Sequence, residues 1–131
     1  MNRIEVIRGR TSKKGEATQG ITRDKGFEAD GVLVGRSRIG PGVESDWHHH
    51  AKRNVYGFIV AGRLRLDYGR TGKHSTEARA GDFFFIPAGL VHRDVNPDSE
   101  EVAVVVNVML GKGPAVINVS LGRKRSRNEK A

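Results

Sequence analysis

The stretch "GDFFFIPAGLVHRDVN", residues 81–96, decides the fold class of this chain. Its first half, residues 82–89, is an apolar run that ends at Pro87 and Gly89, and both residue types stop strands. Its second half contains another short run, residues 91–95, before a series of turn residues. An apolar run and a second, more polar run of this length, separated by Pro and Gly, predict two short β-strands.

The rest of the chain repeats this pattern. We find no window with the i, i+3, i+4, i+7 spacing of apolar residues that an amphipathic helix needs. Short runs bounded by Gly, Pro, Asn and Asp predict further strands at 31–39, 45–50, 55–68, 74–80, 101–110 and 115–121. The run at 55–68 is expected to break at Ala61-Gly62. The sequence therefore predicts an all-β domain, either a sandwich or a barrel.

A second stretch, "GVESDWHHHAKRNVYGFIVAG" (residues 42–62), contains three of the five histidines. Alternate side chains of a strand share a face, so His48 and His50 should point to one side and His49 to the other. Two imidazoles two positions apart on one face are a natural pair of ligands for one metal ion. A metal site is therefore our first hypothesis for His48 and His50.

Together the two stretches resemble the two signature motifs of the cupin superfamily, as found in small single-domain members. The matching positions are Gly42, His48, His50 and Gly62 in the first motif and Gly81, Pro87, Gly89, His92 and Asn96 in the second. The resemblance implies a small jelly-roll β-barrel, which we place at residues 27–121. Residues 1–26 are then a basic segment that includes the first strand, and residues 122–131 a basic tail that we expect to be disordered.

The resemblance also implies one divalent transition metal (Zn, Fe, Ni, Mn or Cu) held inside the barrel by His48, His50 and His92. The sequence departs from the family where many members add a glutamate, because that slot holds Val55, with Asn54 beside it. We expect no Asp or Glu of the two motifs to point inside. A centre of three neutral imidazoles keeps the full charge of its metal, which favours anionic substrates.

Two orientations of the strand after His50 stay open. If Asn54 faces inward, it is a candidate fourth ligand or substrate contact, and Tyr56, on the same face, is a candidate substrate contact. The opposite orientation turns Val55, Gly57 and Ile59 inward and makes the pocket apolar.

The resemblance implies a metal-dependent enzyme of the dioxygenase, cyclase, isomerase or lyase type, acting on a small organic, anionic substrate inside the barrel. The alternatives are a non-catalytic cupin module that binds a small ligand or a metal, and a barrel that has lost its metal. Arg36 and Arg38 alternate on one strand and either meet a carboxylate substrate or are solvated. The resemblance also implies a homodimer, for which the run at 102–110, apolar on both faces, is a suitable covered strand.

The net charge of +8 lies in the two ends of the chain. Residues 1–26 carry seven Lys and Arg against three Asp and Glu, residues 122–131 carry five against one, and residues 27–121 carry eleven of each. A nucleic-acid-binding domain more often has a basic face on its body, so nucleic acid is not the expected partner. No cysteine is present, so a disulfide framework and a Cys-ligated zinc site are excluded. No signal-peptide core or membrane-length apolar run is found, which favours a cytoplasmic protein.

Overall fold

The computed structural model describes residues 2–121, and regular structure in this range is β-strand apart from one 3-10 turn at Gly9–Thr11. Within it the strands are β1 (Lys13–Lys14), β2 (Thr22–Ala29), β3 (Val32–Ile39), β4 (His48–His49), β5 (Asn54–Ala61), β6 (Arg63–Tyr68), β7 (His74–Arg79), β8 (Phe83–Ile86), β9 (His92–Val95), β10 (Ala103–Leu110) and β11 (Ile117–Asn118). The all-β prediction is confirmed. The tail that we expected to be disordered, residues 122–131, lies outside the described residues. Among the residues described, no helix has the length and apolar character needed to cross a membrane.

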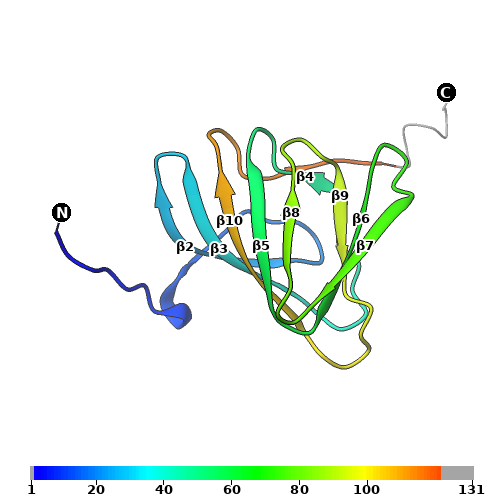
Figure 1. The fold of residues 1–131 in the computed structure, drawn as a ribbon, viewed down its shortest axis with the longest axis horizontal. Helices are drawn as coiled ribbons and strands as arrows, with labels where there is room; N and C mark the ends of the chain where they lie inside the picture. The colour runs from blue at the N-terminus through cyan, green and yellow to red at the C-terminus, as the bar shows by residue number, and fades with distance from the viewer. Residues whose placement is uncertain (1, 122–131) are drawn as a thin grey trace.

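The strands form two antiparallel sheets that enclose the barrel interior (Figure 1). One sheet has the order β1-β2-β3-β10-β5-β8 and the other the order β11-β4-β9-β6-β7. Strands that follow one another in sequence, such as β5 and β6 or β8 and β9, lie in different sheets, so the chain crosses repeatedly between the two. This double-sheet arrangement is the jelly roll that we expected.

The expected domain boundary between residues 26 and 27 falls inside β2, a strand that pairs with β3. Periodicity does not reveal β2, because half of its residues are charged. Asp24 of β2 accepts hydrogen bonds from Arg36 at 3.0 Å and from Arg38 at 2.6 Å, both on β3. These ion pairs lie on the outer face of the sheet, since the residues that alternate with the two arginines are the buried ones. The barrel therefore begins before residue 27, and neither arginine enters its interior.

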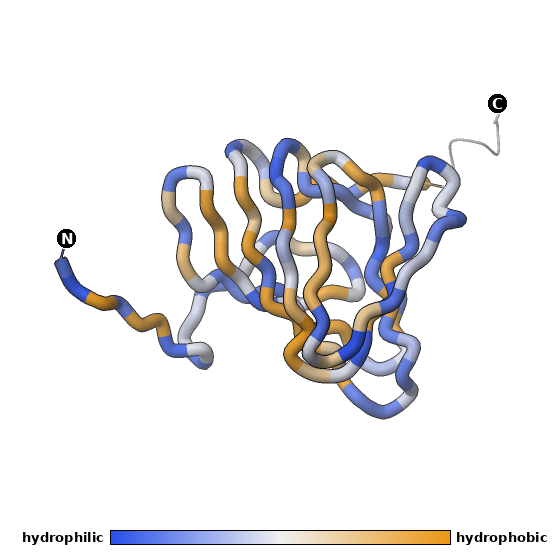
Figure 2. Tube along the Cα trace, in the orientation of Figure 1, coloured by the Kyte–Doolittle hydropathy of each residue, from blue (hydrophilic) through white to orange (hydrophobic). Residues whose placement is uncertain are grey.

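The core fills the space between the two sheets. Alternate residues of β3, β5, β6 and β10 turn inward, as half-buried strands require. The buried apolar side chains that pack together in this core are Ile21, Leu33, Ile39, Val55, Ile59, Leu64, Leu66, Ile86, Ala103, Val105 and Met109. Figure 2 shows apolar positions running along these strands and hydrophilic residues in most of the turns. Full burial of each large aliphatic side chain contributes roughly 1.5–3 kcal/mol.

The alternation along β5 decides the orientation that the sequence left open. Val55 is 1% exposed and Ile59 0%, whereas Tyr56 is 48% exposed. Val55, Gly57 and Ile59 therefore face the interior, and Asn54 and Tyr56 belong to the outward set.

The break that we predicted near Ala61-Gly62 separates β5 from β6. Gly62 adopts a φ of 74°, a conformation that other residues rarely take. A Cβ at this position would also lie 2.7 Å from the carbonyl oxygen of Val102. Only glycine fits this turn, which carries the chain from one sheet to the other.

Candidate metal centre

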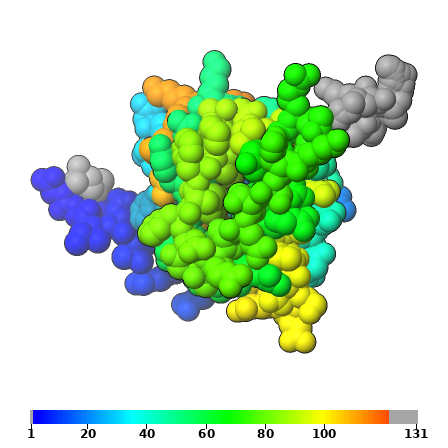
Figure 3. Space-filling view, turned by 45° about the vertical axis from the view of Figure 1, so that its right-hand side comes forward, coloured from blue at the N-terminus to red at the C-terminus, as the bar shows by residue number. Residues whose placement is uncertain are grey.

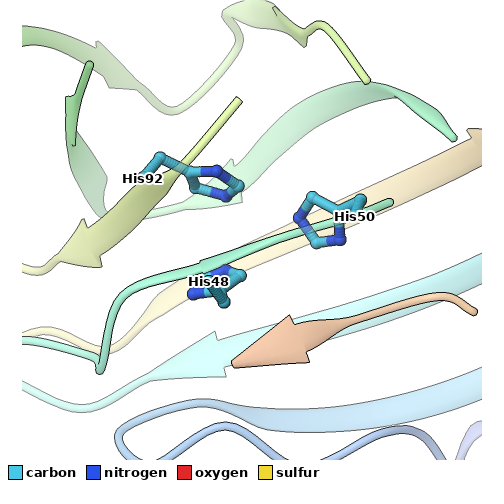
Figure 4. Close-up of side chains that lie close together, drawn as sticks. All are labelled: His48, His50 and His92. Atoms are coloured by element: carbon cyan, nitrogen blue, oxygen red, sulfur yellow. The ribbon is translucent and has the colours of Figure 1, made fainter. Parts of the chain in front are cut away.

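Three histidines meet inside the barrel. His48 of β4 and His92 of β9 are direct partners in the antiparallel pairing of these strands, and His50 follows just after β4. The ring centroids of His48 and His92 are 4.3 Å apart, and that of His50 lies 5.3 and 5.0 Å from them. The residues are 1%, 5% and 1% exposed in chain order. Figure 4 shows the three rings grouped around a common space, so the structure brings together the residues that the two motifs single out.

The two nitrogens of each ring have different roles. In every ring Nδ1 lies 2.9 Å from a backbone carbonyl oxygen. The pairs are His48 with Asp46, His50 with Ala115 and His92 with Leu90. A carbonyl oxygen only accepts, so each Nδ1 carries the hydrogen and donates it, which leaves Nε2 of a neutral ring with a lone pair. Hydrogen bonds of this kind fix the tautomer and orientation of metal-binding histidines.

Burial keeps the three rings neutral at physiological pH. Desolvation is the largest cause that lowers the pKa of His48 to about 3 and the pKa of His50 to about 3, and the nearby His92 lowers both further. Desolvation also lowers the pKa of His92, against an opposing effect of the Asp94 charge. Since only a neutral imidazole binds a metal ion, the rings need lose no proton before they do so.

A carboxylate reaches the same space. Oδ1 of Asp94 lies 3.6 Å from Nε2 of His48 and 3.9 Å from Nε2 of His92. This oxygen is buried and has no hydrogen-bond partner among the described residues. The expectation that no acidic residue of the motifs points inside is therefore wrong. Asp94 stands two positions after His92 on β9, so the parity rule that pairs His48 with His50 would have found it.

The donor atoms of this cluster fit a metal ion. Three imidazole nitrogens with lone pairs converge in a buried space, and a carboxylate oxygen lies beside two of them, those of His48 and His92. Such atoms repel one another unless a cation lies between them, and a buried carboxylate oxygen without a donor lowers stability. Imidazole nitrogen and carboxylate oxygen are together suitable ligands for divalent transition metals.

A half-buried arginine of β2 adds positive charge beside the centre. Nη1 of Arg23 donates to the carbonyl oxygen of Glu16 at 3.0 Å and to Oγ1 of Thr18 at 2.8 Å. After desolvation, its charge is among the causes that lower the pKa of all three histidines. Arg23 pairs across the strands with the buried Ser37, which places it on the inward face. The sequence reasoning missed Arg23 because it missed β2, and strand alternation from Asp24 is the signal that would have found it.

The two further candidates of the sequence lie elsewhere. Oδ1 of Asn54 accepts a hydrogen bond from the backbone N–H of Ala88, at 2.9 Å, in the turn after β8. Tyr56 packs on the outer face against Phe85, with ring centroids 5.0 Å apart. The structure thus has the second of the two orientations that the sequence left open, with Val55 turned inward and neither Asn54 nor Tyr56 in the histidine cluster.

Two segments from opposite ends of the chain close the barrel beside the histidines. β11 pairs with β4, and its Asn118 is tied to the N-terminal segment. Oγ1 of Thr18 donates to Oδ1 of Asn118 at 2.8 Å, and Nδ2 of Asn118 donates to the carbonyl oxygen of Ala17 at 2.9 Å. A cavity of about 30 Å³ lies next to this closure, lined in part by Arg23 and Ala115. It has room for only one or two water molecules.

Comparison with known proteins points to one family. The family model described as a cupin domain matches residues 35–109. Oxalate oxidase GF-3.8 of Triticum aestivum is 32% identical over 97 residues, which are 70% of this chain and 42% of that protein. Putative germin-like protein 3-4 of Oryza sativa subsp. japonica is 30% identical over 102 residues, which are 73% of this chain and 44% of that protein. The chain thus spans less than half the length of these curated relatives.

Solved structures share the fold. The polyketide cyclase RemF from Streptomyces resistomycificus aligns with a TM-score of 0.72 and 18% identity, over 98% of this chain and 94% of that one. A structure of oxalate oxidase aligns with a TM-score of 0.67 and 24% identity, over 86% of this chain and 63% of that one. At such identities the likeness establishes the fold alone.

Proposed function

The chain belongs to the cupin family, and from this membership we propose that it is a metal-dependent enzyme acting on a small organic anion inside the barrel. The observation that carries the proposal is the convergence of His48, His50 and His92, each with Nδ1 held by a carbonyl oxygen. The metal would be one divalent ion of Zn, Fe, Ni, Mn or Cu. When bound, such an ion supplies Lewis-acid or redox chemistry, as dioxygenases, cyclases, isomerases and lyases of this kind use.

The chain's own residues suit an anionic substrate. Arg23 brings a guanidinium beside the histidines, and this group is a strong hydrogen-bond donor for carboxylates. Val55 and Ile59 make the interior apolar, which excludes water and strengthens charge–charge contacts within it. The relative named oxalate oxidase, 32% identical over 70% of this chain, supports a small organic anion as the class of substrate.

Elemental analysis of untagged protein tests the metal site. We expect about one equivalent of a transition metal in the wild type and almost none in His92→Ala, because the buried ligand is lost. His74→Ala is the matched control, since His74 is exposed and stacks on Tyr68 at the surface. Wild-type protein that stays metal-free after reconstitution with each of the five metals would overturn the proposal.

Turnover is tested on the metal-loaded protein. It is incubated with oxalate, with longer dicarboxylates and with a polyketide mimic, in air and without oxygen, and the products are identified by mass spectrometry. We expect conversion of at least one of these substrates by the wild type and none by His92→Ala. Equal conversion by both proteins would show that the centre takes no part.

A non-catalytic metal- or ligand-binding module is the second candidate. The burial of the three rings favours it, together with the closure by Thr18 and Asn118. Azide and oxalate distinguish the two functions, because they change the visible spectrum of Co(II)-loaded protein only where a coordination position is reachable. Saturating concentrations without a spectral change would favour the module.

We also propose that the protein forms a homodimer through the outer face of β5 and β8. On this face Tyr56 packs on Phe85 and Phe58 on Phe83, and Phe83 is 80% exposed. Figure 3 shows β8 and its neighbours on the near face, with the N-terminal segment projecting to one side. Exposed aromatic patches of this kind are typical of protein interfaces.

Light scattering measures the oligomeric state. We expect twice the mass of one chain for the wild type and a monomer for Phe83→Ser, and a monomeric wild type at all concentrations would contradict the dimer. The cytoplasmic location and the absence of a nucleic-acid partner stay predictions of the sequence.

A further inference from the structure

We infer that Asp94 is the fourth protein ligand of the metal centre and supplies the carboxylate that the first motif lacks at Val55. The inference rests on the proposed metal site. It concerns the charge and the donor set of that site, and the metal's presence is tested separately.

The position of Asp94 is close to that of a ligand. Neighbouring donors around an ion with bonds of 2.0–2.2 Å lie roughly 3.0–3.5 Å apart. Oδ1 of Asp94 is 3.6 Å from Nε2 of His48 and 3.9 Å from Nε2 of His92. Shifts of a few tenths of an ångström would therefore bring Asp94 to ligand spacing from these two histidines. The group of donor atoms that all lie within 4.8 Å of one another contains His50 but not Asp94, so a rotation of the carboxylate toward His50 is also needed to complete the coordination sphere.

The backbone around Asp94 is held in place on both sides. Its N–H donates to Oγ of Ser45 at 2.9 Å, and its carbonyl oxygen accepts from the N–H of Ser45 at 2.8 Å. Oγ of Ser45 donates in turn to the carbonyl oxygen of Asp46, which also accepts from Nδ1 of His48. This chain of hydrogen bonds links the backbone of Asp94 to the ring of His48 and holds the two positions relative to each other.

The carboxylate of Asp94 has one other charged neighbour, Arg23, whose charge attracts it without a hydrogen bond to Oδ1. Within residues 2–121, no donor reaches Oδ1 of Asp94. Arg23 is the nearby cation, but its Nη1 is engaged by Glu16 and Thr18. A buried charged oxygen that lacks a hydrogen-bond donor and faces two nitrogen lone pairs is destabilised, and a cation bound between these atoms would stabilise it.

A ligand at this position changes the chemistry of the centre. Three imidazoles and one carboxylate lower the net charge of a divalent site by one relative to three imidazoles alone. Carboxylate oxygen also suits harder ions such as Mn²⁺ better than nitrogen does. The centre should therefore hold Zn²⁺ and Mn²⁺ more tightly than the three histidines alone would.

Asp94→Asn is the decisive variant, because it keeps the shape of the side chain and removes its charge. The dissociation constant for Zn²⁺ is measured by competition with a chromophoric chelator. We expect it to rise more than about 100-fold, beyond the effect of residues that only orient ligands. Glu44→Gln is the matched control, because Glu44 also lies beside β9 but is exposed and pairs with Arg93 at the surface. We expect its affinity to stay within about twofold.

Two results would overturn the inference. One is a rise below about 100-fold in Asp94→Asn while wild type binds metal, because that range indicates an orienting role. The other is a d–d spectrum of the Co(II)-loaded variant that matches the wild type. If wild type itself binds no metal, the proposed function fails as well, so the two failures are distinguishable.

The fold of the variant has its own measurement. Metal-free Asp94→Asn should unfold at or above the wild-type temperature, because a buried charge without a donor is removed. Added Zn²⁺ should raise the melting temperature of wild type much more than that of the variant. A metal-free variant that melts far below wild type would show that Asp94 supports the fold instead, and would also overturn the inference.

Discussion

His48 and His92 are direct partners across the β4–β9 strand pair, and their ring centroids lie 4.3 Å apart. Cross-strand partners have Cβ atoms about 4.5–5.5 Å apart wherever such strands pair, so the sheet itself sets the spacing of these two ligands. His50 lies beyond the strand, and its Nδ1 is anchored to the carbonyl oxygen of Ala115. Strand pairing and this backbone anchor therefore fix the relative positions of the three rings.

Metal binding is a direct source of stability, because only the folded chain brings the three histidines together. An ion that binds only the folded chain at a thousandfold excess over its Kd adds about 4 kcal/mol. For a domain of this size, 1 kcal/mol shifts the melting temperature by roughly 3–5 °C. Treatment with EDTA is therefore expected to lower the Tm by about 10 °C or more, and added metal should restore it. Scanning fluorimetry measures the shift, and a Tm that does not respond to the chelator would argue against a resident metal.

The metal-free protein is expected to lose stability as the pH falls from about 6.5 toward 3. Burial lowers the pKa of His48 and of His50 to about 3. Between these limits the unfolded chain binds protons that the folded chain does not, so the free energy of unfolding decreases with decreasing pH. Within this window, each of the two histidines adds on the order of 1 kcal/mol per pH unit to the slope of the free energy of unfolding against pH. Above pH 6.5 they add nothing to that slope.

Urea unfolding of metal-free protein at pH 7, 6 and 5 measures this slope. His74→Gln should keep the wild-type slope, because His74 is exposed. A free energy of unfolding that stays level from pH 6.5 to 5 would mean that the rings titrate normally.

The sequence predicted the parts of the fold that depend on local signals. Pro87 and Gly89 end a strand, Gly62 separates two strands, and alternation places His48 and His50 on one face. Each of these features follows from backbone preferences or strand parity within a few residues. Strands with alternating apolar residues were found for the same reason.

The remaining features depend on contacts between distant segments. Alternation along β5 is compatible with either Asn54 or Val55 facing inward. In the folded chain β5 pairs with β8 and β10, and Val55 is the residue that faces inward. Arg23 lies on a charged strand that is stabilised by ion pairs to β3, which periodicity does not detect. Asp94 is different, because parity from His92 was sufficient to place it inside.

Arg23→Gln is expected to weaken the binding of oxalate to the metal-loaded protein about tenfold or more and to leave the metal content unchanged. A hydrogen bond to a charged group contributes about 1.5–3 kcal/mol, and the variant removes the cation that would provide it. Titration of oxalate into Co(II)-loaded protein gives the affinity. Arg36→Gln is the control, because Arg36 pairs with Asp24 on the outer face. Equal oxalate affinity in wild type and Arg23→Gln would show that Arg23 does not contact the bound anion.

Asn54→Ala is expected to lower stability by about 0.5–1.5 kcal/mol without changing Zn²⁺ affinity. The amide oxygen of Asn54 holds the N–H of Ala88 in the turn after β8, and the side chain belongs to the outward set of β5. Asn54→Asp keeps an acceptor at this place and should recover most of the loss. Chemical denaturation and chelator competition measure the two quantities. A drop in Zn²⁺ affinity as large as that expected for Asp94→Asn would indicate that Asn54 is a ligand of the metal.

Asn96 closes the second motif and is fully buried, with all its polar atoms engaged. Nδ2 donates to the carbonyl oxygens of Ile39 at 3.0 Å and Glu101 at 2.8 Å, and Oδ1 accepts from the N–H of Asp98 at 2.9 Å. Asn96→Ala leaves three backbone groups without a partner, so we expect a loss of about 3 kcal/mol.

Urea denaturation measures the loss in Asn96→Ala, and elemental analysis should still find the wild-type amount of metal in the folded fraction. Asn96→Asp is the informative control. It keeps the acceptor for Asp98 but turns a carboxylate oxygen toward two carbonyl oxygens, and it should therefore be at least as destabilised as the alanine variant. An aspartate variant as stable as wild type would mean that the two donated hydrogen bonds contribute little, and that the turn between β9 and β10 is held by Oδ1 alone.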